Sequence, residues 1–465
     1  MLRALMRCMA FGPCLPFPAV AQYWAPANLP VVVEQLRQFY TNGEEDVFCI
    51  CGRTFVPEDA PSPWRNGLVC NMNGVWDTLG IFNQELSSVA KWGDTLFVSG
   101  GFTGVDWQIL PGNLLALYDG TWHQDPQFTQ ASHGGYLRTI GDSLFILGHF
   151  EVEPGVDTIG VGLRQAGRWH PIGDLPPPDS PSGAPWIFDI ELYNGQLVIT
   201  GSINTINGYD VFVLQGDDWV PLGGGLVGWN SFGKCLAVYQ GDLYLGGGMS
   251  MAAGDVGQNI MRWDGNQWHP LGSGLQTQLN NFGNFGTVEN MLVHDGELFV
   301  GGSFRYAGGI PAHGVARWDG SQWCSVAPYG PTNTVNCLGF FQDTLLINFN
   351  GTINGDLMGR IAKFIAPTYE DNCGLWAGTE EGQSTEMLLH VWPNPTRAEL
   401  RFTTPSNGPV QVRILDSSGR QVLKRSFTPI AHTIELDIGL FDSGIYQIHL
   451  NDRLGMSRTT RFVKE

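Results

Sequence analysis

The sequence predicts an all-β protein, and three observations lead to this class. The 465 residues include 62 Gly and 28 Pro, a content that implies many turns and therefore many short strands. Runs in which apolar and polar residues alternate recur along the chain, bounded by Gly, Pro and Asp. A motif that contains tryptophan also returns about every fifty residues, so the strands belong to repeated units.

The repeat is clearest in residues 262–272 (RWDGNQWHPLG) and 317–323 (RWDGSQW). Weaker copies precede them, and the recurring tryptophans are Trp76, Trp122, Trp169, Trp219, Trp268 and Trp323. Their spacings are 46, 47, 50, 49 and 55 residues. Before each copy, a tight turn leads into a strand that ends in glycine, as in residues 93–102 (GDTLFVSGGF) and 296–304 (GELFVGGSF). Each repeat is therefore expected to form a four-stranded antiparallel meander.

Four-stranded units with a period of 40–50 residues are typical of β-propeller blades, which bury their faces against one another. The double glycine and the late tryptophan resemble kelch-like propellers. With a last copy at residues 342–348, the repeats predict about seven blades over residues 30–366, with six or eight as alternatives. We expect a segment from Val31–Tyr40 to close the ring by pairing with the last blade.

The repeat also indicates a structural role for its aromatic and acidic residues. Eight tryptophans lie in the repeat frame and are expected to pack between blades: Trp76, Trp122, Trp169, Trp219, Trp263, Trp268, Trp318 and Trp323. The Asp of each Trp-Asp-Gly copy is expected to shape a turn rather than to bind a metal ion. His123, His170 and His269 directly follow frame tryptophans, which favours structural or solvent-facing positions.

Residues 391–465 form a second module of alternating strands and turns, with a VWPNP run at its start. Its landmarks are Pro393, Asn394, Pro395, Gly419, Arg420, Gly444, Tyr446 and Lys464. In this order at the C-terminus, these motifs closely resemble the sorting domain of the type IX (Por) secretion system of Bacteroidota-type bacteria. The resemblance implies a small Ig-like β-sandwich that the type IX secretion machinery recognises. It also implies delivery of the protein to the medium or to the outer cell surface.

The N-terminal residues 1–21 are expected to be a signal peptide that directs the chain to the periplasm. Arg3 and Arg7 precede an apolar stretch, and Ala19-Val20-Ala21 offers a cleavage site before Gln22. No later run approaches the ~18 apolar residues of a spanning helix, so we expect no transmembrane segment. Residues 367–390 have the composition of an exposed linker, and processing is expected between Gly378 and Val391.

The charge and the cysteines exclude several classes of function. The net charge of the chain is −19. Residues 391–465 carry ten Lys and Arg against seven Asp and Glu, a net charge of +3, so residues 1–390 have a net charge of −22. So acidic a body disfavours binding to nucleic acid and to anionic membranes. A disulfide from Cys49 or Cys51 to Cys70 is plausible, and seven cysteines beyond residue 21 leave at least one thiol outside such pairs. Zinc-type ligand spacings are absent, so no metal site is predicted.

The candidate functional surface is the face that carries the long connections, because binding residues concentrate on loops held by a rigid scaffold. The candidate ligand-binding residues are the aromatic residues Trp107, Trp186, Trp229, Phe282, Phe285 and Tyr306. Such rings could stack on sugars or anchor a protein partner. The alternative is that they cover the loops and plug the central channel.

No catalytic motif is present: the sequence lacks a Gly-x-Ser-x-Gly elbow, a His-Glu-x-x-His motif and a phosphate loop. Asp189, Glu191 and Glu289 lie at strand entries and are expected to point toward the channel. No catalytic residue and no cofactor are therefore predicted. The preferred function is an exported, non-enzymatic propeller that binds an extracellular glycan or protein. The alternative is a hydrolase or lyase that acts on extracellular polysaccharide from the long-loop face.

Overall fold

The computed structural model describes residues 23–29, 32–41, 47–55, 66–72, 74–110, 112–128, 135–153, 156–176, 185–203, 210–228, 231–278, 286–370, 372–373, 391–392, 395–403, 410–416, 420–429, 433–451 and 457–465. The signal peptide predicted for residues 1–21 lies outside them. The chain divides into two compact units, Met1–Trp376 (unit 1) and Ala377–Glu465 (unit 2). The fold is all-β; among the described residues, helix is limited to the short 3-10 turns η1 (Met251–Ala253) and η2 (Met358–Arg360). None of the described helices is long and apolar enough to span a membrane.

The described part of unit 1 contains seven antiparallel sheets of at least four strands. In six of these sheets, four strands lie side by side in the order in which they occur along the chain. The first sheet has β2 (Val32–Thr41), β3 (Val47–Phe55), β4 (Asn66–Met72) and β5 (Val75–Phe82); the second has β6 (Leu86–Trp92), β7 (Thr95–Gly100), β10 (Leu114–Tyr118) and β11 (Thr121–Gln124); and the third has β12 (Tyr136–Ile140), β13 (Ser143–Glu153), β14 (Val156–Gln165) and β15 (Arg168–Pro171). The fourth has β16 (Trp186–Tyr193), β17 (Gln196–Ser202), β18 (Val211–Gln215) and β19 (Asp218–Pro221); the fifth has β20 (Phe232–Tyr239), β21 (Asp242–Gly248), β22 (Ile260–Trp263) and β23 (Trp268–Pro270); and the sixth has β25 (Val288–His294), β26 (Glu297–Gly302), β29 (Val315–Trp318) and β30 (Trp323–Ser325). The seventh combines β31 (Val335–Phe341), β32 (Thr344–Phe349) and β33 (Ile361–Phe364) with β1 (Trp24–Pro26).

Short strands decorate the long connections of unit 1. The hairpin of β8 (Gly104–Val105) and β9 (Gln108–Ile109) extends the first sheet by pairing with β5. The hairpin of β27 (Tyr306–Ala307) and β28 (Ile310–Pro311) pairs with β24 (Leu275–Gln276). Both hairpins lie between the second and third strands of a sheet.

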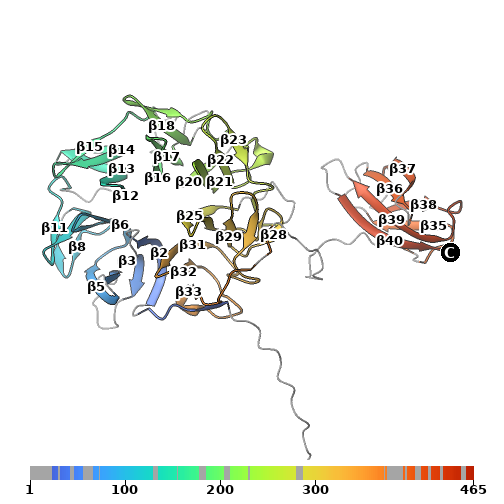
Figure 1. Ribbon diagram of the computed structural model, residues 1–465, viewed down its shortest axis with the longest axis horizontal. Coiled ribbons are helices and arrows are strands. Elements are labelled where there is room, and N and C mark those ends of the chain that lie inside the picture. Colours follow the sequence, from blue (N-terminus) through green and yellow to red (C-terminus); the bar gives the residue numbers. More distant parts are fainter. Residues whose placement is uncertain are drawn as a thin grey trace, which may run out of the picture. The chain divides into compact units, whose positions relative to one another are not determined.

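The first strands of the seven sheets (β2, β6, β12, β16, β20, β25 and β31) contact one another in chain order, and β31 also contacts β2. Figure 1 shows the sheets of unit 1 arranged around a common centre, toward which these first strands face. The residues that line this centre therefore come from the first strands.

The N-terminal strand β1 completes the last sheet. Trp24 pairs with Phe364 of β33, and the indole of Trp24 donates to the backbone oxygen of Tyr329 at 3.0 Å. The expectation that Val31–Tyr40 would make this pairing is wrong, because Val32–Thr41 instead pairs with β3 as the first strand of its own sheet. Trp24 is 1% exposed, so burial of this large ring holds the strand in place.

The repeated tryptophans connect neighbouring sheets. The indole nitrogens of Trp122, Trp219, Trp268 and Trp323 donate to the backbone oxygens of Leu79, Ile172, Leu222 and Leu271, at 3.0, 2.9, 3.1 and 3.0 Å. Leu79 lies in β5, and each of the other three acceptors directly follows the last strand of the preceding sheet. Leu222 belongs to a Pro-Leu-Gly motif at residues 221–223. Its Gly223 has a φ of 60°, and a Cβ there would lie 2.1 Å from the ring of Trp263. The Trp and Pro-Leu-Gly motifs are therefore two halves of one contact between sheets.

The turn role expected for the Asp of Trp-Asp-Gly also agrees with the structure. The Asp264 carboxylate accepts hydrogen bonds from the backbone nitrogens of Asn266 and Gln267, each at 2.8 Å. These bonds, with the contact to His269, hold the pKa of Asp264 below its ordinary value.

Two disulfides join described residues of unit 1. Cys49–Cys70 joins β3 to β4 and is one of the two pairings left open by the sequence. Cys324–Cys373 was not predicted, and it fixes the segment after β33 to β30. Within the stretch expected to be linker, the Tyr369 ring lies under the guanidinium of Arg317, 4.7 Å from the ring centroid. Tyr369 and Cys373 are therefore held against the sheets of unit 1. The remaining described cysteines are buried thiols: Cys51, Cys235 and Cys337.

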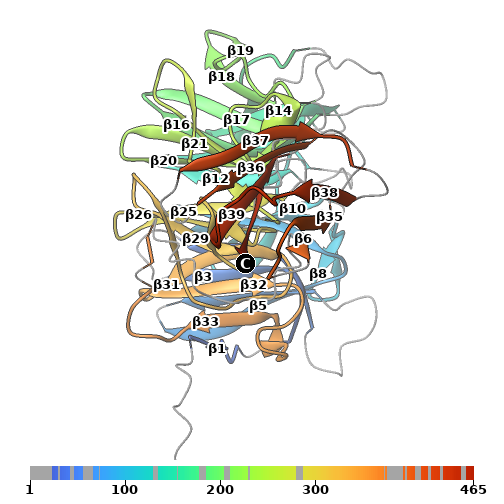
Figure 2. The same cartoon turned by 90° about the vertical axis from the view of Figure 1, so that its right-hand side faces the viewer.

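The described part of unit 2 contains two antiparallel sheets. One contains β34 (Val391–Trp392), β35 (Glu399–Thr403) and β38 (Thr433–Asp437); the other contains β37 (Gln421–Phe427), β36 (Val410–Leu415), β39 (Gly444–Asn451) and β40 (Ser457–Lys464). Figure 2 shows β36, β37 and β39 side by side. Alternate residues of these strands form one apolar core, in which Tyr446 stacks on Phe462 at 5.4 Å between ring centroids.

The landmarks of the C-terminal motif have different structural roles. Tyr446 is buried, Gly444 opens β39 opposite Lys464, and Pro395 is exposed. The Arg420 side chain donates to Asp416 at 3.1 Å across the β36–β37 turn. Pro393, Asn394 and Gly419 lie outside the described residues.

Candidate functional site

Two cavities lie where the first strands meet at the centre of unit 1. The mouth cavity, about 190 Å³, is lined mainly by residues near the beginnings of these strands: Ser87, Tyr136, Phe188, Lys234, Glu289 and Asn336, with Arg138 and Asn290 beside them. A second cavity of about 530 Å³ is lined by residues farther along the same strands, including Asp189 and Glu191. Both cavities are built on strands rather than on loops, so their side chains are held by the sheets.

An irregularity shared by five first strands builds the mouth cavity. In β6, β16, β20, β25 and β31 the register with the second strand skips one residue near the start of the strand. The skipped residues are Ser87, Phe188, Lys234, Glu289 and Asn336, and all of them line the cavity. A β-bulge bends its strand and re-aims a side chain. The fold thus supplies one variable residue per bulged strand to a common space.

The aromatic and cationic part of the cavity comes from three consecutive first strands. The Lys234 ammonium lies over the Phe188 ring, 4.1 Å from its centroid, and Tyr136 meets the same ring edge-on at 6.3 Å between centroids. The Arg138 Nε donates to Asp189 Oδ1 at 2.7 Å, and its side chain is 37% exposed against 4% for Asp189. The two cations therefore come from the strands on either side of β16, which carries the aromatic ring.

Asp189 holds this part of the site together. Besides Arg138, its carboxylate accepts from the backbone nitrogens of Ile190 and Leu236, each at 2.9 Å. It thereby connects β12, β16 and β20. The negative charge of Asp189 raises the pKa of Arg138 above its ordinary value, so the guanidinium stays charged. A guanidinium has five N–H donors, and the Nε–H bond to Asp189 uses one of them.

The opposite part of the cavity consists of amides and a carboxylate. Glu289 accepts a hydrogen bond from the Thr287 hydroxyl at 2.6 Å. The Asn336 amide donates to Asn348 at 3.0 Å, which fixes its orientation. Asn290 Oδ1 is buried and has no hydrogen-bond partner among the described residues. An unsatisfied buried acceptor costs ~1–3 kcal/mol, so a donor that reached Asn290 would bind favourably.

Asn290 differs from the equivalent residues of other sheets. At this position Gln38, Ser88 and Asp189 each accept a hydrogen bond from a backbone nitrogen of the next first strand, namely Val89 (3.0 Å), Leu137 (3.0 Å) and Leu236 (2.9 Å). These bonds satisfy N–H groups on the inner edge of each strand, where no further strand pairs. The Asn290 oxygen, in contrast, remains open.

Burial in the centre of unit 1 raises the pKa of two titratable groups, Cys235 and Glu191. Burial raises the pKa of the Cys235 thiol well above its ordinary value, so this residue behaves as an inert apolar side chain. Burial also raises the pKa of Glu191, which lines the second cavity and accepts from its neighbour Leu192 at 2.8 Å.

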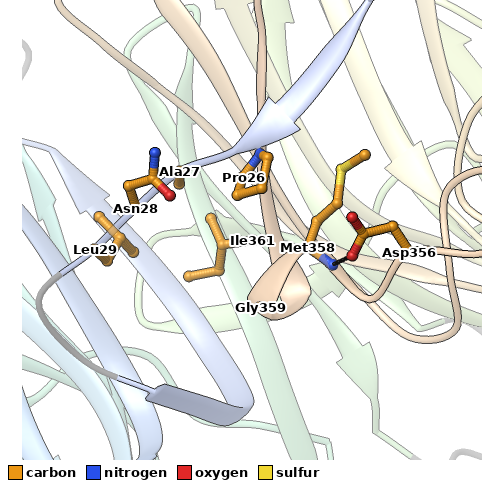
Figure 3. Close-up of a pocket in the computed structure, with 8 residues that line it drawn as sticks. All are labelled: Pro26, Ala27, Asn28, Leu29, Asp356, Met358, Gly359 and Ile361. Carbon is orange, nitrogen blue, oxygen red and sulfur yellow. Dashed lines mark hydrogen bonds between the residues drawn. The ribbon is translucent and has the colours of Figure 1, made fainter.

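A third cavity of about 280 Å³ lies between the end of β1 and η2 (Figure 3). Its lining is mainly apolar or backbone, from Pro26, Leu29 and Ile361. The Asp356 carboxylate accepts from the backbone nitrogen of Met358 at 2.8 Å, as the dashed line in Figure 3 marks. Because that carboxylate shapes its own turn, this cavity offers little specific chemistry.

One group of residues has the composition of a metal site. His294 Nε2 lies 3.7 Å from Asp295 Oδ2 and 3.6 Å from Asp343 Oδ1. Both carboxylates are more than four-fifths exposed, and the imidazole stacks on Phe340 at 3.6 Å between ring centroids. The geometry fits a loose surface ion pair between two turns.

The aromatic residues selected from the sequence occupy separate places. Trp107 lies in the turn between β8 and β9 and is 51% exposed, and Trp186 opens β16 and is 50% exposed. Tyr306 is half-buried in β27, paired with Gln276. None of these three lines the mouth cavity. The other three, Trp229, Phe282 and Phe285, lie outside the described residues.

Sequence reasoning missed Arg138, Phe188, Lys234 and Asn336, although the repeat carries a signal for most of the site. Each of the five skipped residues stands six positions before the first residue of the turn that follows its strand. For example, Lys234 precedes Gln240 and Glu289 precedes Asp295 at this distance. The carboxylates selected from the sequence do line the centre: Glu289 the mouth cavity, and Asp189 and Glu191 the second cavity.

Comparisons with known proteins identify the C-terminal unit. Residues 390–465 match the family model described as a secretion system C-terminal sorting domain. A search of curated proteins found no match to the chain.

Similar solved structures include a bacterial extracellular domain, a fungal oxidase and a Bacteroides ovatus protein. The extracellular domain of a one-component system of B. thetaiotaomicron is 12% identical with a TM-score of 0.42, and the match covers 95% of this chain but 57% of that one. A fungal alcohol oxidase of the AA5 family, in complex with copper, is 14% identical with a TM-score of 0.39, and the match covers 97% and 98% of the two chains. A Bacteroides ovatus xyloglucan GH43B protein is 12% identical with a TM-score of 0.26, and the match covers 81% and 89%. Scores this low carry no argument about function.

The sorting domain fixes the destination of the protein. A domain of this family is read by the type IX secretion machinery, which exports its cargo across the outer membrane. The protein is therefore exported to the outer cell surface or secreted.

Proposed function

We propose that this protein is an exported, seven-bladed, kelch-like β-propeller that binds an extracellular ligand in its mouth cavity and catalyses no reaction. The seven sheets, the contact between β31 and β2, and the pairing of β1 with β33 support the closed ring. The tryptophan contacts between successive sheets support the blade assignment.

The domain boundaries are part of the same proposal. Residues 1–21 are the signal peptide, residues 30–366 together with β1 form the propeller, and residues 391–465 form the sorting domain. The linker starts beyond Cys373, since that residue is bonded to Cys324. Processing between Gly378 and Val391 would leave this disulfide in the mature protein.

The observation that carries the binding function is the set of bulged residues in the mouth cavity. A channel that only needed filling would be lined by apolar side chains, as protein interiors are. Instead, Phe188, Lys234, Glu289 and Asn336 bring four different chemistries to one space. Ligand sites typically combine an aromatic surface with a few convergent polar groups.

The size of the cavity favours a glycan over a protein ligand. Its volume of about 190 Å³ is below the ~300–1,000 Å³ of pockets that hold drug-sized ligands. One sugar unit of a larger chain suits this space better than a protein surface. The loop aromatics Trp107, Trp186, Trp229, Phe282, Phe285 and Tyr306 would then contact neighbouring units of the same chain.

A hydrolase or lyase that acts on extracellular polysaccharide is the alternative function, and one observation favours it. The raised pKa of Glu191 is a property that a general acid needs at neutral pH. Its neighbour Asp189 is held by Arg138 and two backbone nitrogens, which suits a structural role better than that of a base. Binding without catalysis is therefore preferred.

The test is binding of the mature protein to a glycan array, followed by calorimetry with the best ligand. Phe188→Ala should weaken binding at least tenfold because it removes the aromatic surface of the cavity. Tyr118→Ala, at the exposed end of β10 and outside the cavity lining, is a control for general effects of a lost aromatic side chain. Binding unchanged by Phe188→Ala would refute the mouth cavity as the site, and turnover of a polysaccharide would favour the enzyme.

A further inference from the structure

We propose, building on the function proposed above, that the mouth cavity binds an acidic sugar, with its anionic group between Arg138 and Lys234 and its hydroxyl groups against Asn290 and Glu289. The ligand class is a saccharide that carries a carboxylate or a sulfate.

The anionic end of the ligand is inferred from the charges of the cavity. Arg138 and Lys234 come from β12 and β20, on either side of β16 with Phe188. Asp189 neutralises Arg138, whereas Lys234 has an aromatic ring and no carboxylate partner among the described residues. Lys234 thus gives this part of the site about one positive charge, which Glu289 on the neighbouring first strand balances over the lining as a whole. A bound anion would give the Lys234 ammonium a direct partner.

The hydroxyl end is inferred from the opposite part of the cavity. Asn290 Oδ1 is a buried acceptor with no partner in the part of the chain that the structure describes. Glu289, which accepts from Thr287, is a further acceptor in the same lining. Both can accept hydrogen bonds from donor groups of a ligand. Sugar hydroxyl groups are such donors, and the C–H face of a sugar ring packs on aromatic rings such as Phe188 and Tyr136.

Other anions fit less well. A nucleic acid or an anionic membrane would meet the acidic surface of the whole unit, and neither can enter a cavity of about 190 Å³. At physiological salt the Debye length is ~8 Å, so distant carboxylates repel a small anion only weakly. Lys234 and Arg138 therefore dominate its binding locally. An amino acid also has an anionic end, and it is included as a competing probe.

The experiment is calorimetry on the full mature protein with matched probes: neutral oligosaccharides, their uronate-containing counterparts and their sulfated counterparts. We expect the acidic forms to bind at least tenfold more tightly than the neutral ones, and this preference to fall as salt rises from 50 to 500 mM. The carboxylate and sulfate series separate the two sources of negative charge.

Three variants sharpen the test. Lys234→Gln should remove most of the preference for acidic sugars, and Lys234→Arg should largely restore it. Asn290→Leu should weaken the binding of acidic and neutral sugars alike. Lys363→Gln, on β33 and away from the cavity, is the matched control and should change nothing. Thermal melting of each variant verifies that it is folded.

The outcomes separate this inference from the function on which it rests. If acidic and neutral sugars bind with equal affinity and Phe188→Ala abolishes binding of both, the acidic-sugar assignment is overturned. The proposal that the cavity binds a glycan would then still hold. Tighter binding of a free amino acid than of any acidic sugar would also overturn it. No binding to any saccharide would overturn both proposals.

Discussion

The outer and inner edge strands of the sheets in unit 1 follow opposite rules. At the outer end the same residue recurs: Trp219, Trp268 and Trp323 each donate to the carbonyl oxygen that ends the preceding sheet. At the inner end the bulge recurs, but its residue changes, from Phe188 to Lys234. The comparison teaches that repetition marks residues required for packing, whereas variation at a fixed position marks residues available for function.

The largest expected effect tests the outer end. Trp268→Ala should lower the free energy of unfolding by about 3–5 kcal/mol, because a buried indole and its bond to Leu222 are both lost. Urea unfolding followed by tryptophan fluorescence measures this. Trp107→Ala, with half of that side chain exposed, should cost well under half as much. Equal losses would contradict the difference between frame and loop tryptophans.

The second effect concerns the segment after β33. Replacing Cys324 and Cys373 by Ser should lower the free energy of unfolding by about 2–4 kcal/mol, since it reopens a loop with a sequence separation of 49. The contacts of Tyr369 with Phe299 and Arg317 should loosen as well. The matched variant replaces Cys49 and Cys70, whose separation is 21, and should cost less. Unfolding under non-reducing conditions compares the two, and the reverse order would show that loop length does not decide the loss.

The outer end could be predicted from the sequence because the packing tryptophan returns in six successive repeats. Spacings of 46 to 55 residues between tryptophans were enough to indicate four-stranded units. Two outer features could not be found in this way. Trp24 lies outside the repeat, so the closing strand was placed at Val31–Tyr40, and cysteine spacing does not determine that Cys324 pairs with Cys373.

The inner end was harder to predict, for a physical reason. A search for recurring residues passes over positions where the residue differs in every copy, such as Ser87, Phe188 and Asn336. Aromatic residues outside the repeat are more conspicuous in the sequence, but Trp107 and Trp186 do not line the mouth cavity. A bulge depends on strand pairing, which a single sequence does not specify, although its distance from the turn is constant.

The third prediction tests the inner end. Asp189→Asn should lower the free energy of unfolding by about 1–3 kcal/mol, because the carboxylate serves Arg138, Ile190 and Leu236 together. A double-mutant cycle with Arg138→Met, measured by chemical unfolding, isolates the share of the ion pair. The exposed part of Arg138 limits that share through solvent screening. A coupling free energy near zero would mean that Asp189 acts through the backbone bonds alone.

The smallest effect is a pH dependence in the second cavity. Burial raises the pKa of Glu191 in the folded protein, so the unfolded chain loses this proton at a lower pH than the folded protein does. Stability is therefore lost as pH rises from the unfolded value of about 4.3 through the folded one, and the penalty is complete above it. Glu191→Gln removes the ionisable group, so its free energy of unfolding relative to the wild type should increase between pH 4 and pH 7. Glu153→Gln, at the exposed end of β13, is the control. If the stability of Glu191→Gln relative to the wild type does not change over this range, water reaches Glu191 in the folded protein. In that case the inner strands can hold a charged carboxylate at no cost in stability, unlike the apolar contacts at the outer strands.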